Sequence, residues 1–156
     1  MRRVLASAAI AVSLVTLAGA GRADPDMVWI YMEPSHPQTD PARLAYGVPA
    51  TEDGLISIDC RPGSGTLSLT TWIDPDPHVG RTTLRAGAAR SVHSSKTEPN
   101  DIAEGVAVET SASTQDPAIR AFRKGAALSV ITGRSVTRLP PVTRAAAEPF
   151  FRVCGG

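Results

Sequence analysis

Three potential metal ligands alternate with prolines in one short stretch of the chain. Asp74, Asp76 and His78 occupy every second position, separated by Pro75 and Pro77. On an extended backbone such residues share a face, and carboxylate and imidazole groups suit a divalent cation. Asp and Pro are also favoured in ordinary turns, so a turn after a strand is the alternative. The pattern makes this loop a candidate metal site and the centre of one candidate function, a metal-dependent hydrolase.

Aromatic residues define a second candidate site. Trp29, Tyr46 and Trp72 lie in or beside segments with a strand-like pattern. Exposed aromatic rings bind sugars and peptides through stacking and contact area, so these three could line a groove. Packing in the core or against a sheet is the more frequent role of such residues. A small-ligand or inhibitor module built on these rings is therefore kept as a further alternative.

Patterns for nucleophilic or cofactor chemistry are missing from the sequence. Ser64 lies in a Gly-rich turn without the G-x-S-x-G spacing, and His93 lies in a strand-like segment. No phosphate loop, dinucleotide fingerprint or H-E-x-x-H motif occurs. We therefore predict no catalytic residue and no cofactor.

The chain has two cysteines, Cys60 and Cys154. In an oxidising compartment an intramolecular disulfide is the simplest outcome, since neither a C-x-x-C motif nor a histidine at ligand spacing accompanies them. The bridge would close a loop of about 95 residues, for which chain entropy gives roughly 4–5 kcal/mol of stabilisation. It would tie the end of the chain to an early strand.

The N-terminus has the features of a secretory signal peptide. A short basic start, Arg2 and Arg3, precedes an apolar run of about fifteen residues and an A-x-A-like site. Cleavage after Ala23 is predicted, with Ala20 as the alternative, and the apolar run is shorter than the roughly 20 residues of a spanning helix. We expect a periplasmic or secreted protein, with no stable membrane insertion after cleavage.

Residues 24–156 are predicted to form one domain of about 133 residues. Without the leader the chain has thirteen Lys and Arg against fifteen Asp and Glu, a net charge of −2. We interpret these charges as interspersed, which argues against nucleic-acid binding.

Short alternating segments separated by Pro, Gly and Asp predict a mainly β protein. We expect about seven or eight strands, with a hairpin at residues 54–73, a polar loop at 95–100 and a helix capped by Asp116 and stopped at Gly125. Pro149 should interrupt a second helix that begins at Thr143. The predicted class is an antiparallel β-sandwich or partly open barrel with one or two short helices.

The C-terminal part runs in the order helix, Gly, strand and late Cys. The segments that carry this order are Asp116-Pro117-Ala118-Ile119, Gly125, Leu128-Ser129-Val130, Leu139-Pro140 and Phe150-Phe151-Arg152-Val153-Cys154. It resembles the ending of small exported proteins of α-proteobacterial type, including uncharacterised periplasmic proteins and the invasion-associated locus B family. The resemblance implies an exported β-sandwich-like domain and carries over no catalytic residue. The leading hypothesis is a non-catalytic envelope domain that binds a protein or glycan.

Overall fold

The computed structural model describes residues 26–51, 53–74, 79–99 and 105–155. The predicted signal peptide, residues 1–23, lies outside them, as does residue 24, where the mature chain would begin. The described chain forms nine strands: β1 (Val28–Met32), β2 (Ala42–Gly47), β3 (Gly54–Cys60), β4 (Thr66–Ile73), β5 (Arg81–Ala86), β6 (Ala89–Pro99), β7 (Val106–Ser113), β8 (Leu128–Thr132) and β9 (Ser135–Leu139).

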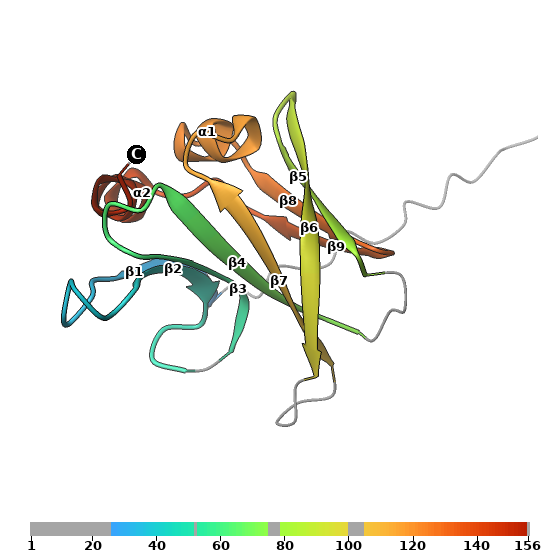
Figure 1. Ribbon diagram of the computed structural model, residues 1–156, viewed down its shortest axis with the longest axis horizontal. Helices are drawn as coiled ribbons and strands as arrows, with labels where there is room; N and C mark the ends of the chain where they lie inside the picture. Colours follow the sequence, from blue (N-terminus) through green and yellow to red (C-terminus); the bar gives the residue numbers. More distant parts are fainter. Residues whose placement is uncertain (1–25, 52, 75–78, 100–104, 156) are drawn as a thin grey trace, which may run out of the picture.

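All nine strands pair antiparallel in a single sheet, in the order β1-β2-β3-β4-β7-β6-β5-β8-β9. The sheet curls into a half-barrel, as Figure 1 shows. This confirms the predicted mainly β antiparallel class in its barrel-like form. Two short helices complete the fold, α1 (Pro117–Arg123) and α2 (Arg144–Val153).

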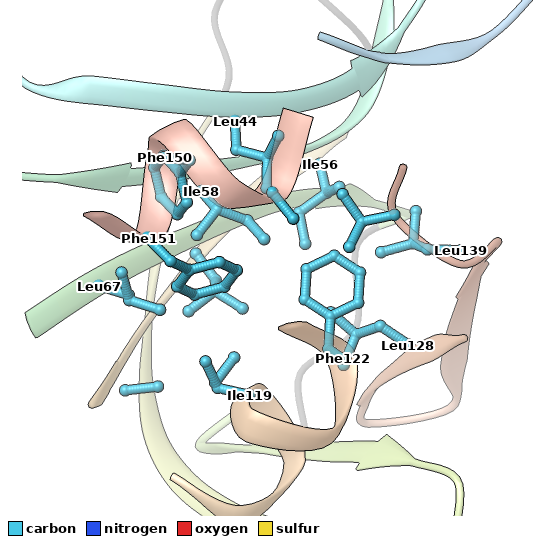
Figure 2. Close-up of a cluster of buried hydrophobic side chains, with 14 of the residues drawn as sticks. Leu44, Ile56, Ile58, Leu67, Ile119, Phe122, Leu128, Leu139, Phe150 and Phe151 are labelled. Atoms are coloured by element: carbon cyan, nitrogen blue, oxygen red, sulfur yellow. The ribbon is translucent and has the colours of Figure 1, made fainter. Parts of the chain in front are cut away.

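The helices close one end of the curled sheet (Figure 1). Helix α1 packs against β5 and β6, and α2 packs against β1 and β2. The buried apolar residues of the strands, such as Leu84 of β5 and Leu128 of β8, face the helices, and the residues between them point to the opposite face. Figure 2 shows the resulting core, in which Phe122 of α1 and Phe150 and Phe151 of α2 are fully buried among strand Leu and Ile side chains. Neither helix is long and apolar enough to cross a membrane, and the described residues contain no other helix.

Three buried threonine hydroxyls and the half-buried Ser95 hydroxyl form a hydrogen-bonded row across the inner face of the sheet. Thr132 of β8 bonds Thr82 of β5 at 2.9 Å, and Ser95 of β6 donates to Thr82 at 2.7 Å and bonds Thr110 of β7 at 2.9 Å. A buried hydroxyl without a partner would cost free energy, so the row allows polar residues at core positions of four adjacent strands.

The disulfide between Cys60 and Cys154 is confirmed, with 5.8 Å between the two Cα atoms. Backbone hydrogen bonds reinforce the junction. The Gly63 and Gly65 amides, in the β3–β4 turn, donate to the carbonyl oxygens of Val153 and Cys154 at 2.8 and 2.9 Å. The end of α2 is therefore held to the β3–β4 hairpin by covalent and polar contacts.

Two local predictions were wrong, and one strand was not predicted. The segment predicted as a loop at 95–100 continues β6 to Pro99, because residues 95–99 pair with β7. Strand β9 was not predicted; it pairs with β8 across a tight turn. Helix α2 runs through Pro149 instead of stopping there. Proline at that position removes one helical hydrogen bond, but Phe150 and Phe151 just beyond it are fully buried, and that burial favours continuing the helix.

Candidate functional site

The structure describes only part of the predicted metal loop. Asp74 is exposed directly after β4, whereas Asp76 and His78 lie outside the described residues. Within the described ranges, no group of three His, Cys, Asp or Glu side chains could hold a metal ion. The metal site at Asp74, Asp76 and His78 therefore stays a prediction, and the same holds for the hydrolase built on it.

The aromatic candidates separate into core and surface. Trp29 and Tyr46 are buried, so their assignment to a ligand groove is corrected. The ring of Trp29 lies 5.3 Å from that of Tyr46 and 5.1 Å from that of Phe122, between centroids, and its Nε1 donates to the Pro140 carbonyl at 3.1 Å. Trp29 and Tyr46 point to the face of the sheet that the helices cover. Trp72 lies on the opposite face and is 42% exposed. Of the three, only Trp72 is available to a ligand.

A serine, a histidine and an aspartate meet where β6 contacts the start of α1. Nε2 of His93 lies 3.1 Å from Oδ2 of Asp116 and 3.0 Å from Oγ of Ser91. Ser91 Oγ donates to Oδ1 of Asp116 at 2.8 Å. The cluster borders an open cleft of about 500 Å³ that Thr66, Ser111 and Gln115 also line. The residue types are those of a hydrolase triad, so their geometry decides the assignment.

The hydrogen bonds among Ser91, His93 and Asp116 differ from those of a catalytic triad. A catalytic histidine accepts the serine proton on one ring nitrogen while the carboxylate holds the other. Here Ser91 and Asp116 share a single nitrogen of His93, and Ser91 gives its proton to the carboxylate. Asp116 also accepts from the Ala118 and Ile119 amides as the N-cap of α1. The cluster therefore connects α1 to β6 and has a structural role.

A cleft of about 400 Å³ between the two helices carries mostly positive charge. Arg123, Lys124 and Arg144 line it together with Glu148. Two of these cations are already engaged: Arg144 pairs with Glu148 at 3.1 Å, and the guanidinium of Arg123 lies 5.4 Å above the Phe151 ring. The cleft therefore adds positive charge to the end of the fold that carries the helices. Two of its three cations already have partners, so they are less available to a ligand.

The outer face of the sheet has two chemically different halves. Over β2, β3, β4 and β7 the charged side chains have polar partners close by. Arg43 Nε donates to Asp59 at 2.6 Å, Ser57 donates to the same carboxylate at 2.8 Å, and Ser68 donates to Glu109 at 2.7 Å. These groups satisfy one another within the surface.

Over β5, β8, β9 and residues 89–94 of β6, the outer face is basic and apolar. Strand register places Arg90, Arg85, Ser129 and Arg138 in one row, each directly opposite the next. The adjacent row consists of the directly paired residues Val92, Thr83, Ile131 and Val136. Arg81 lies beyond that second row on β5. We call this surface, made up of the two rows and Arg81, the arginine face.

The arginines of this face are exposed and, within the described chain, form no ion pair. Val92 and Val136 are 48% and 43% exposed, among the most exposed large apolar side chains described. This surface was not predicted from the sequence. The available signal was the absence of Asp and Glu from residues 79–97 and 117–147, although both stretches contain several Lys and Arg.

Comparison of the chain with known protein families, with curated proteins and with solved structures found no match. The arginine face therefore has to be interpreted from its own geometry and charge.

Proposed function

We propose that this protein is a non-catalytic binding domain of the cell envelope, and that its arginine face binds an anionic partner. One observation carries the proposal: Arg85 and Arg90 lie directly opposite each other on neighbouring strands, with Arg138 in the same row. Like charges in directly opposed positions destabilise a sheet. In the described part of the chain no carboxylate lies in this row, and an anionic partner would offset the resulting cost in free energy.

The other half of the outer face supports the same interpretation. There Arg43 forms an ion pair with Asp59, which is the arrangement expected of an arginine that has only a structural role. Among the described residues, the guanidinium groups of the arginine face form no ion pair, and a guanidinium suits planar bidentate contacts with carboxylate or phosphate oxygens. The contrast lies within one sheet, so it does not result from overall composition.

Export to the periplasm is the second part of the proposal. It is supported by the signal-peptide pattern of residues 1–23 and by the disulfide, which persists in oxidising compartments. In this proposal the Cys60–Cys154 disulfide stabilises the fold. The arginine face binds the envelope partner, a protein or a glycan that carries acidic groups.

The test measures the salt dependence of binding to heparin, used as a general anionic probe. In the double variant R85Q/R138Q we expect the affinity to fall about tenfold or more and the salt dependence to weaken, because fewer counterions are displaced. The matched control, R61Q/K96Q, removes the same charge from other exposed positions. Equal losses in the two variants would show that net charge alone governs binding, and the proposal would be abandoned.

A further inference from the structure

The arginine face has a shape that narrows the class of its partner, an inference that rests on the proposed function. Arginine side chains are long and valine side chains are short, and both stand roughly perpendicular to a sheet. The row Val92, Thr83, Ile131 and Val136 lies between the arginine row and Arg81. The surface is therefore a shallow trough with an apolar floor and guanidinium groups at both sides.

Backbone geometry gives the size of this trough. Strands lie about 4.8 Å apart, so the floor runs about 14 Å across β6, β5, β8 and β9. Arg81 and Arg85 are four residues apart on β5, which separates their Cα atoms by about 13–14 Å. A helix is about 10–12 Å wide with its side chains, so one amphipathic segment fits between the arginines.

The recessed floor argues against a lipid surface as the partner. Interfacial binding needs apolar side chains that reach past the charged ones into the acyl region. Here Val92 and Val136 are shorter than the arginines around them. A purely ionic polymer would leave the valines without a partner, although they are nearly half exposed.

We infer that the arginine face docks an acidic amphipathic segment of another polypeptide. Its apolar side chains would cover Val92 and Val136, and its carboxylates would pair with Arg85, Arg90 and Arg138. Charge complementarity fixes the sign, because no carboxylate of the described chain lies in either row. Burial of the valines would exclude water and strengthen the ion pairs at the sides.

The probe is a synthetic helix of about 14 residues with leucines on one face and glutamates on the other. A scrambled peptide of the same composition, with its leucines spread around the helix, is the comparison. Binding to the full chain is measured by fluorescence anisotropy. We expect the amphipathic peptide to bind about tenfold more tightly than the scrambled one.

Two pairs of substitutions separate the two parts of the surface. R85Q/R138Q and V92S/V136S should each weaken binding of the amphipathic peptide about tenfold, whereas R61Q/K96Q should leave it within about twofold. All substituted positions are exposed, and circular dichroism verifies that each variant is folded.

The remaining outcomes overturn the inference in distinguishable ways. Equal binding of both peptides, with V92S/V136S unchanged, would mean that only charge is recognised; heparin binding that still depends on Arg85 and Arg138 would then leave the proposed function intact. Tighter binding to phosphatidylglycerol vesicles than to the peptide would replace the polypeptide with a lipid surface. If no probe responds to R85Q/R138Q, the inference and the proposed function both fail.

Discussion

Asp116 connects α1 to the sheet through both of its carboxylate oxygens. Oδ1 accepts from Ser91 and from the Ala118 amide at 2.8 and 2.9 Å, and Oδ2 lies 3.1 Å from His93. The side chain is only 8% exposed, so each of these bonds is largely shielded from water. At the residue scale, the capping signal visible in the sequence thus has a second role that the sequence did not reveal.

Replacing Asp116 by alanine should destabilise the protein by about 2–3 kcal/mol. The change removes the N-cap and leaves Ser91 and His93 without their acceptor. Asparagine keeps one acceptor oxygen for the cap, so D116N should cost about half as much. Urea unfolding measures both values, with the exposed Asp53→Ala as a control expected to change stability by less than about 0.5 kcal/mol. A loss below about 1 kcal/mol in D116A would contradict the proposed role.

The pairing register of strands β6, β5, β8 and β9 creates the arginine face. Arg85 and Arg90 come from the two strands of one hairpin, whereas Arg138 arrives through the pairing of β5 with β8 and of β8 with β9. A shift of one residue in any of these pairings would move an arginine to the inner face. The buried residues Leu84, Leu128 and Leu139 prevent such a shift, because they would then face water.

Helix α2 contains a proline, Pro149, in its interior, where proline is unfavourable. Pro149 lies six positions after the N-cap Thr143, where it cannot donate to the Ala145 carbonyl. Pro149→Ala restores that donor, so we expect it to stabilise the protein by about 1–3 kcal/mol in urea unfolding. Pro141→Ala, outside the helix, controls for the greater freedom that losing a proline gives the unfolded chain. If P149A stabilises the protein no more than P141A does, the helical bond is not what limits stability here.

For the molecule as a whole, one covalent link joins the residue that follows α2 to the end of β3. Cys60 and Cys154 are 94 residues apart and both are buried. Their bridge holds α2 over β1 and β2, and so covers the core that Trp29 and Tyr46 share with Phe122.

Removing the bridge with C60A/C154A should lower the free energy of unfolding by about 4–5 kcal/mol, because a long loop of the unfolded chain is released. Guanidinium unfolding of the variant measures the loss. The wild-type protein unfolded under reducing conditions provides the comparison and should show a loss of similar size. A decrease of less than about 1 kcal/mol in both would mean that tail packing and hydrogen bonding alone hold the junction.

Several features followed from local sequence. Alternation of apolar and polar residues marked β3 and β4 with their observed bounds, and Asp116, Pro117 and Gly125 delimited α1, because strand periodicity and helix capping depend on neighbouring residues. The disulfide also followed, since two cysteines allow one intramolecular pairing. Strand β9 and the continuation of β6 did not, because both are stabilised by partners distant in the chain.

The surface that carries the proposed function was decided by the tertiary structure. The sequence held the arginines, the valines and the stretches without carboxylates, but Arg90, Arg85 and Arg138 become neighbours only through the order β6-β5-β8-β9 and its register. Strand order results from burying the inner face as a whole beneath two helices, which is a non-local requirement. The sequence therefore determines which residues are charged, whereas the folded sheet determines that the arginines lie together on one face.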